Sequence, residues 1–217
     1  MGTKDFASTD ENFSVLGIVL KKQIGEKNLH NFCSSIWPEE PTPENHKDCH
    51  ECGLIRHGTR MVWGEGNPDA QIMIILDNPG SREDRENNPF VCGTRQTLQQ
   101  AVHQVGLKVE DLYVTYILKR RPIRAYDKEQ TRQICINHLM QQLSSKQPQL
   151  IVCLGNIAVQ SFFQNPETDV KSLRGKFHQI HGFQTTVAYH PLAVRRRPNL
   201  WSLFLEDWML VSEQYFK

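Results

Sequence analysis

The sequence has no long hydrophobic run and little net charge of either sign. Its longest apolar stretches, residues 72–76 and 150–154, are far shorter than the roughly 20 residues of a membrane-spanning helix. The 217 residues carry 25 basic and 24 acidic side chains, for a formal net charge of +1. Any nucleic-acid binding must therefore come from local patches. With no internal repeat and no low-complexity tract, we expect a soluble protein with one main domain.

We also expect no secretory signal, because the first 14 residues mix basic and acidic side chains without a following apolar segment. We therefore expect a cytoplasmic protein whose six cysteines are thiols or metal ligands rather than disulfides. Residues 13–22 and 28–36 have helical patterns, and Pro38, Pro41 and Pro43 then interrupt regular structure. We interpret residues 1–45 as an N-terminal helical appendage and residues 46–217 as the main domain.

From residue 71 onward, short apolar segments alternate with longer amphipathic ones. The predicted strands are residues 71–76, 112–118, 150–154 and 185–189, and the predicted helices are residues 96–105, 128–145, 158–163 and 200–215. Apolar strands separated by helices are typical of a parallel sheet that is covered on both faces. The predicted fold class is therefore α/β.

Ligands of such sheets bind beyond the carboxyl ends of the strands, so the residues that follow each strand are candidates for chemistry. Asp77 and Asn78 follow the first predicted strand, and His190 follows the fourth. A carboxylate and an amide can orient water or stabilise positive charge, although a turn or helix cap is the alternative interpretation. His190 is either a buried structural histidine or a reactive group.

An aromatic residue and a basic cluster lie near these strand ends in the sequence. Phe90 is either a core side chain or a ring that stacks on a flat base. Arg195, Arg196 and Arg197 form either a solvated face or a surface that neutralises phosphates, and the basic residues within 119–124 have the same two interpretations.

Cys49 and Cys52 form a C-x-x-C pair flanked by His46 and His50. This spacing alone does not decide between zinc, an iron–sulfur cluster, redox chemistry and chance. Cys135, on a predicted helix, could supply a third thiolate. We interpret the other three cysteines as residues without a chemical role.

From about residue 49 to residue 211, these segments resemble the family 4 uracil-DNA glycosylases. The matching stretches, in order, are Cys49-x-x-Cys52-x-Leu54 and residues 62–70, 79–80, 83–85, 89–91, 111–115, 119–122, 173–175 and 189–191. Each stretch is weak alone, but their ordered combination is specific. The resemblance implies a three-layer α/β/α fold around a four-stranded parallel sheet, acting on uracil in DNA.

The resemblance also implies roles for individual residues. Asp77 occupies the family's acidic position, and Asn78 resembles the asparagine that holds the attacking water in mismatch-directed relatives. His190 matches the histidine that hydrogen-bonds a carbonyl oxygen of the base, and Phe90 matches the aromatic that stacks on it. Residues 192–197 correspond to the loop that enters the duplex. The expected site comprises catalytic Asp77, Asn78 and His190, base-binding Phe90, Tyr116, Pro79 and Gly80, and DNA-binding Arg121, Leu192, Arg195, Arg196 and Arg197.

Two positions depart from the family pattern. Tyr116 stands where the family reads uracil with an asparagine, and a phenol does not reproduce an amide's paired donor and acceptor. The family's four-iron, four-sulfur cluster uses four cysteines, of which three match Cys49, Cys52 and Cys135, while Arg120 stands at the fourth position. An arginine does not ligate iron. The cluster is therefore lost, incomplete or completed by another group such as His46, His50 or His138.

The predicted function is a monofunctional DNA N-glycosylase that flips out a damaged base, expected to be uracil, and hydrolyses its glycosidic bond in base excision repair. No metal is needed for this chemistry. One alternative is a glycosylase for a different modified base, which Tyr116 motivates. Others are a non-catalytic DNA-damage-binding module and a thiolate-bound structural metal protein. The expected partner is DNA, without a membrane, and the expected state is a monomer.

Overall fold

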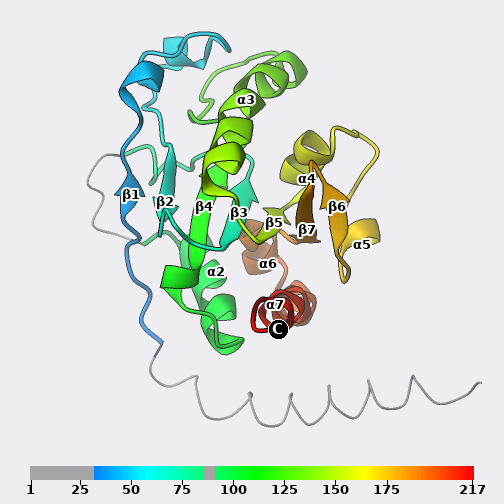
Figure 1. Cartoon of the computed structure of the whole chain (residues 1–217). Coiled ribbons are helices and arrows are strands. Elements are labelled where there is room, and N and C mark those ends of the chain that lie inside the picture. Colours follow the sequence, from blue (N-terminus) through cyan, green and yellow to red (C-terminus); the bar gives the residue numbers. More distant parts are fainter. Residues whose placement is uncertain (1–31, 86–90) are drawn as a thin grey trace, which may run out of the picture. The chain divides into compact units, whose positions relative to one another are not determined.

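One seven-stranded sheet organises the part of the chain that the structure, a computed structural model, describes: residues 32–85 and 91–217. The strand order is β1-β2-β4-β3-β5-β7-β6 (Figure 1), within a unit that runs from Ser34 to Lys217. The predicted helix at 13–22, most of the one at 28–36, and Phe90 lie outside the described residues. The division near residue 45 stays a prediction.

Four parallel strands form the centre of the sheet. They are β4 (Leu112–Tyr116), β3 (Ile72–Leu76), β5 (Leu150–Leu154) and β7 (Phe183–Ala188). These are the four strands that the apolar segments predict, so the parallel α/β core is confirmed. Ile72 pairs with Leu112 on one side and Leu150 on the other, which sets the ends of all three strands level.

Three short antiparallel strands extend the sheet beyond the four predicted ones. They are β1 (Glu39–Glu40), β2 (Gly64–Gly66) and β6 (His178–Ile180). Each has only two or three residues, and β1 and β2 consist of glutamate and glycine. Such segments carry no apolar alternation for sequence analysis to detect.

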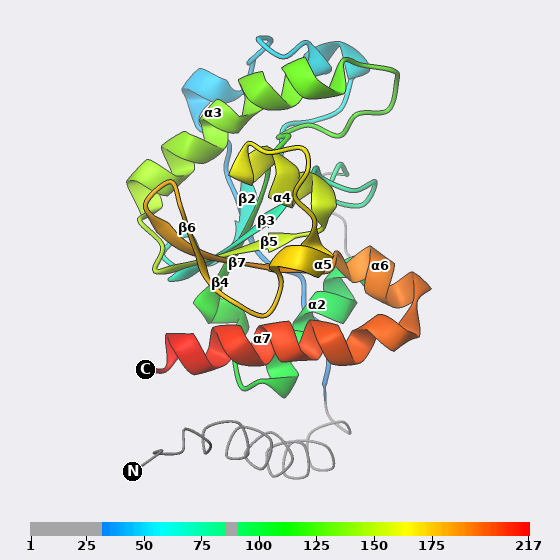
Figure 2. The ribbon, with the colours of Figure 1, turned by 90° about the vertical axis from the view of Figure 1, so that its right-hand side faces the viewer.

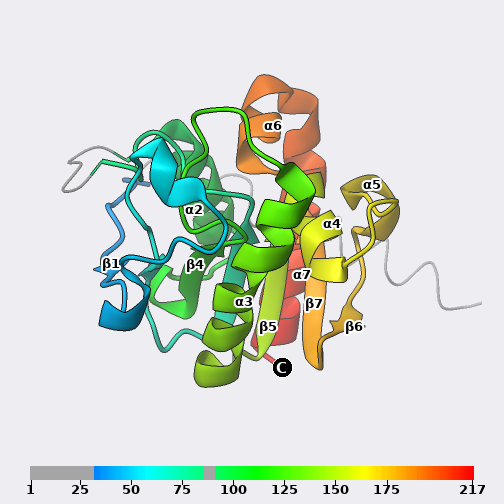
Figure 3. The ribbon, with the colours of Figure 1, turned by 90° about the horizontal axis from the view of Figure 1, so that it is seen from above.

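Helices cover both faces of the sheet. On one face lie α2 (Gly93–Gln104), α6 (Pro191–Arg196) and α7 (Trp201–Tyr215), and on the other lie α3 (Lys128–Lys146) and α4 (Asn156–Phe163) (Figures 2 and 3). The short helix α5 (Val170–Leu173) and four single turns complete the fold: Glu44–His46, Leu54–His57, Val109–Asp111 and Pro198–Leu200. No described helix is long and apolar enough to cross a membrane.

The two faces of β3 explain why its sequence shows no polar side. Ile72 and Ile74 pack into the core beneath α2 and α7, together with Trp208. Met73 and Ile75 alternate with them and point into the core beneath α3 and α4. A strand that is covered on both faces must be apolar at every position, and all five residues of β3 are buried.

Helix α6 replaces the loop predicted for residues 192–197. Pro191 occupies the first turn, where its missing N–H and fixed φ favour helix formation. The His190 side chain caps the helix by accepting the N–H of Leu192. Six residues are too few for a clear helical periodicity, so no sequence pattern predicts this helix.

Candidate active site

A cavity of about 410 Å³ opens where the carboxyl ends of the parallel strands meet. It is lined by Asp77, Asn78 and Gly80 after β3, by Tyr116 at the end of β4, and by His190 and Leu192 after β7. This is the edge at which α/β sheets bind their ligands. Six of the residues predicted for the site therefore share one cavity, whose volume suits a single heterocycle.

The other described residues predicted for base and DNA binding do not line this cavity. Pro79 connects two lining residues, and Arg121 lies with Nη1 3.9 Å from Oδ2 of Asp84. Arg195 lies against the start of α2, since a Cβ on Gly93 would be 2.0 Å from its Nη1. Arg196 and Arg197 are exposed. The arginines at 195–197 are therefore surface residues of α6 and its C-cap, outside the cavity lining.

His190 is held in one orientation by its role as a helix cap. Its Nδ1 accepts the backbone N–H of Leu192 at 3.1 Å, so the neutral ring carries its proton on Nε2. Burial, with help from nearby Arg95, lowers the pKa of His190 to about 4. At neutral pH the cavity therefore contains an uncharged imidazole with one N–H donor.

Gly155 allows this imidazole to lie close to the end of β5. Its φ is +90°, a conformation that side chains rarely adopt. A Cβ there would lie 2.9 Å from Cβ of His190. Any larger residue would both strain the turn and push the histidine out of position.

Asp77 and Asn78 supply oxygen atoms to the same cavity. Burial raises the pKa of Asp77, and the Arg132 guanidinium, with Nε 3.5 Å from Oδ1, opposes that shift. Asn78 donates from Nδ2 to the carbonyl oxygen of Pro79 at 2.7 Å. This bond orients the amide and leaves its Oδ1 as an acceptor for a ligand or water.

Tyr116 is occupied by protein partners and does not present a reading group. Its hydroxyl donates to Oε1 of Glu65 at 2.5 Å and accepts from Nη2 of Arg95 at 3.1 Å. Arg95 Nη2 also forms an ion pair with Glu65. Burial first, and then Glu65, raise the pKa of Tyr116 well above its usual value, so the phenol is neutral.

Arg95 and Glu65 are the site residues that sequence reasoning missed. Glu65 lies on β2, within one of the segments that carry the family resemblance, but nothing in its spacing assigns it a partner. Arg95 lies on α2, where an arginine is ordinarily a surface residue. Here Arg95 is only 5% exposed, because an element 30 residues away supplies its counter-ion.

Arg120, at the fourth cysteine position of the iron–sulfur pattern, is part of the folded structure. It is 7% exposed and donates to the carbonyl oxygens of Thr59 at 2.6 Å and Lys47 at 2.7 Å. Arg120 therefore has a structural role, and its guanidinium supplies no ligand for iron.

The three matching cysteines do not complete a metal site. A hydrogen bond from Cys135 lowers the pKa of Cys52 to about 6, and Sγ of Cys49 lies 3.3 Å from Nε2 of His138. The ring of His46 stacks on Trp63. Among residues 32–85 and 91–217, no group of three or more His, Cys, Asp or Glu side chains is arranged to hold a metal ion. The residues present therefore do not fit a four-iron, four-sulfur cluster.

The fold and this cavity define a class of protein: an α/β protein with polar side chains fixed around a small pocket at the carboxyl edge of its parallel sheet. The sequence family described as the uracil DNA glycosylase superfamily matches residues 63–210. The chain belongs to this superfamily.

Individual relatives agree with that assignment. A protein named type-4 uracil-DNA glycosylase from Archaeoglobus fulgidus is 32% identical over 76% of this chain and 87% of its own length. The protein of the same name from Saccharolobus solfataricus is 32% identical over 77% of this chain and 82% of its own length. The one from Thermotoga maritima is 30% identical over 77% of this chain and 90% of its own length.

Proposed function

We propose that this protein is a monofunctional DNA glycosylase that flips uracil out of DNA and hydrolyses its N-glycosidic bond, leaving an abasic site for base excision repair. Membership of the superfamily and the names of its relatives support the reaction class. The observation that carries the proposal is the neutral His190, whose Nε2–H is held ready at a base-sized cavity.

The proposed chemistry separates charge across the glycosidic bond. Extrusion places the base in the cavity, at a cost that is lower for poorly paired bases. As the bond lengthens, His190 donates from Nε2 to a carbonyl oxygen of the departing base, which gains negative charge. Asp77 favours the positive charge on the sugar, and the Asn78 oxygen positions the attacking water. Phe90 is proposed to stack on the base, although it lies outside the described residues.

The proposed DNA contacts lie on α6. Leu192 is 36% exposed at the start of this helix, where an apolar side chain can wedge between base steps. Arg195, Arg196 and Arg197, with Arg121, would then contact phosphates. The cytoplasmic location and the monomeric state expected from the sequence stay predictions.

An abasic-site assay with His190→Ala tests this function. On duplexes with one uracil, the wild type should produce alkali-labile sites, and the variant should be slower by about 100- to 1,000-fold, the usual effect of losing one donor to a developing anion. His103→Ala, at an exposed position on α2, is the matched control and should retain activity. A variant as fast as the wild type would place the chemistry elsewhere.

A second function deserves the same assay because Tyr116 is not a base reader in this structure. Duplexes that contain hypoxanthine or modified pyrimidines would identify a glycosylase for another base. Tight binding of these duplexes without any abasic product, unchanged in His190→Ala, would instead identify a non-catalytic damage-binding protein.

A further inference from the structure

We propose that Arg95 determines which bases this site excises, by presenting a fixed cationic hydrogen-bond donor to a carbonyl oxygen of the extruded base. The inference rests on the proposed glycosylase function and assigns the reading of the base to a residue other than Tyr116. The substrate class is a base with a carbonyl oxygen at the position where cytosine or adenine carries an amino group.

The first step is that the Tyr116 hydroxyl, at the position where the family reads the base, already makes hydrogen bonds to protein groups. The Tyr116 hydroxyl has one hydrogen, which it donates to Glu65, and it accepts from Arg95. Turning this hydroxyl toward a base would leave the Glu65 carboxylate and the Arg95 guanidinium each short of a bond in a buried setting. Tyr116 is therefore a positioning residue for Arg95.

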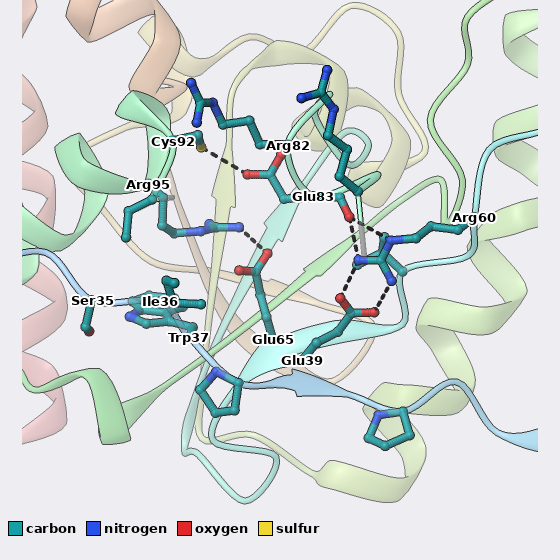
Figure 4. Close-up of a pocket in the computed structure, with 15 residues that line it drawn as sticks. Ser35, Ile36, Trp37, Glu39, Arg60, Glu65, Arg82, Glu83, Cys92 and Arg95 are labelled. Atoms are coloured by element: carbon teal, nitrogen blue, oxygen red, sulfur yellow. Dashed lines mark hydrogen bonds and ion pairs between the residues drawn. The ribbon is translucent and has the colours of Figure 1, made fainter. Parts of the chain in front are cut away.

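The second step is that contacts with Glu65, Tyr116 and Trp37 hold Arg95 in place. Both of its hydrogen bonds to described side chains leave from Nη2, and its guanidinium carbon lies 5.3 Å from the ring centroid of Trp37. Figure 4 shows the guanidinium beside Trp37, reaching toward the Glu65 carboxylate. These contacts hold the planar group in place before any ligand arrives.

The third step is that one donor of this buried group has no partner among the residues that the structure describes. Arg95 Nε is buried and makes no hydrogen bond among the described residues. Arg95 lines the base-sized cavity and also the neighbouring cavity of about 390 Å³ that Figure 4 shows. A buried N–H without an acceptor is costly, and a base carbonyl oxygen that reaches Nε from the cavity would relieve that cost.

The fourth step is selectivity. His190 and Arg95 both offer N–H donors, and Arg95 can never become an acceptor. A base with two carbonyl oxygens can accept hydrogen bonds from both residues. A base with an amino group in place of one oxygen would bring two N–H donors together, which is unfavourable. The same cation stabilises the negative charge that the base acquires as it leaves.

The experiment pairs a change in Arg95 with a change in the base. Arg95→Met keeps the length of the side chain and removes its donors, and combining it with Glu65→Gln avoids leaving a buried carboxylate unpaired. Glu65→Gln alone is the matched control. Single-turnover excision is measured on duplexes with uracil, with 2-thiouracil and with pyrimidin-2-one, which lacks the oxygen at C4.

We expect the double variant to excise uracil about 10- to 100-fold more slowly than Glu65→Gln, the effect of one charge-assisted hydrogen bond. Replacing the carbonyl group of the base that Arg95 contacts should lower the excision rate of the Glu65→Gln control. The same replacement should lower the rate of the double variant much less. A merely structural arginine would leave this dependence on the base unchanged. The pKa of His190, followed by NMR, should also rise when the nearby cation is removed.

The outcomes separate the two proposals. If the wild type excises none of the bases tested, the proposed function fails and this inference fails with it. If the wild type and Glu65→Gln excise uracil and the double variant stays folded with the same rates and the same base dependence, only the role of Arg95 is overturned. Arg95→Lys checks a folding defect, because it keeps the charge and should recover part of the rate.

Discussion

At the scale of single residues, the site combines a neutral donor with a fixed cation. His190 is uncharged because it is buried and faces Arg95, while Arg95 keeps its charge because Glu65 pairs with it. Two donors of different charge thus lie around one cavity. The arrangement favours a leaving group that starts neutral and departs as an anion.

The lowered pKa of His190 predicts how stability depends on pH. An unfolded histidine titrates near 6.5, whereas folded His190 has a pKa of about 4. As the pH falls between these values, the unfolded chain binds the proton and the folded chain does not, so stability is lost. The stability that depends on a neutral His190 is therefore fully present above pH 6.5.

Urea unfolding at pH 7.5 and pH 4.5 measures this effect. The wild type should lose more stability between the two pH values than His190→Gln, which has no imidazole to protonate. The same loss in both proteins would mean that His190 is not buried as described. Activity should not fall through titration of His190 between pH 5 and pH 8.

At the scale of elements, the turn at the end of β4 is tied to the loop that carries Cys49 and Cys52. The Arg120 guanidinium makes this connection through the carbonyl oxygens of Thr59 and Lys47. In a cluster-containing protein, iron–thiolate bonds would connect the same segments. Here the buried Arg120 guanidinium connects them through hydrogen bonds.

Removing this connection should destabilise the protein. Arg120→Met should lower the free energy of unfolding by about 2–4 kcal/mol, because two buried charge-assisted hydrogen bonds are lost. Arg121→Met is the matched control, because Nη1 of the partly exposed Arg121 is 3.9 Å from Oδ2 of Asp84, and the loss of this ion pair should cost less than about 1 kcal/mol. Denaturant unfolding compares the two, and equal losses would contradict the bracing role of Arg120.

The sequence predicted the elements whose pattern is long and apolar. The four parallel strands and the helices α2, α3, α4 and α7 follow from such runs, with ends displaced by a few residues. Helix α6 and the edge strands did not, because they are too short for periodicity. Arg95 could not be placed from sequence, since its burial depends on a carboxylate that β2 brings to α2 only in the folded chain.

At the scale of the whole molecule, a net charge of +1 leaves DNA attraction to local basic groups. The exposed arginines of α6 follow Leu192, which lines the cavity, and we propose that they contact the backbone of a bound duplex. Affinity should therefore depend on salt through a few phosphate contacts rather than through overall charge.

Arg196→Gln tests whether local phosphate contacts set the salt dependence of DNA binding. If Arg196 contacts one phosphate, the slope of log affinity against log salt should become shallower by about 0.9. Lys108→Gln is the control, because Lys108 is exposed and lies before the opposite, amino end of β4. Fluorescence anisotropy across a salt series measures both, and identical slopes would remove Arg196 from the interface.

The bond from Leu192 N–H to Nδ1 of His190 joins two events that are usually treated separately. If DNA contacts α6 as proposed, a movement of this helix would act on the imidazole through that bond, and a pull on the imidazole would act on the start of α6. The position of α6 and the orientation of the imidazole are therefore coupled. Through this coupling, the way DNA seats against the helix would influence the donor that faces the glycosidic bond.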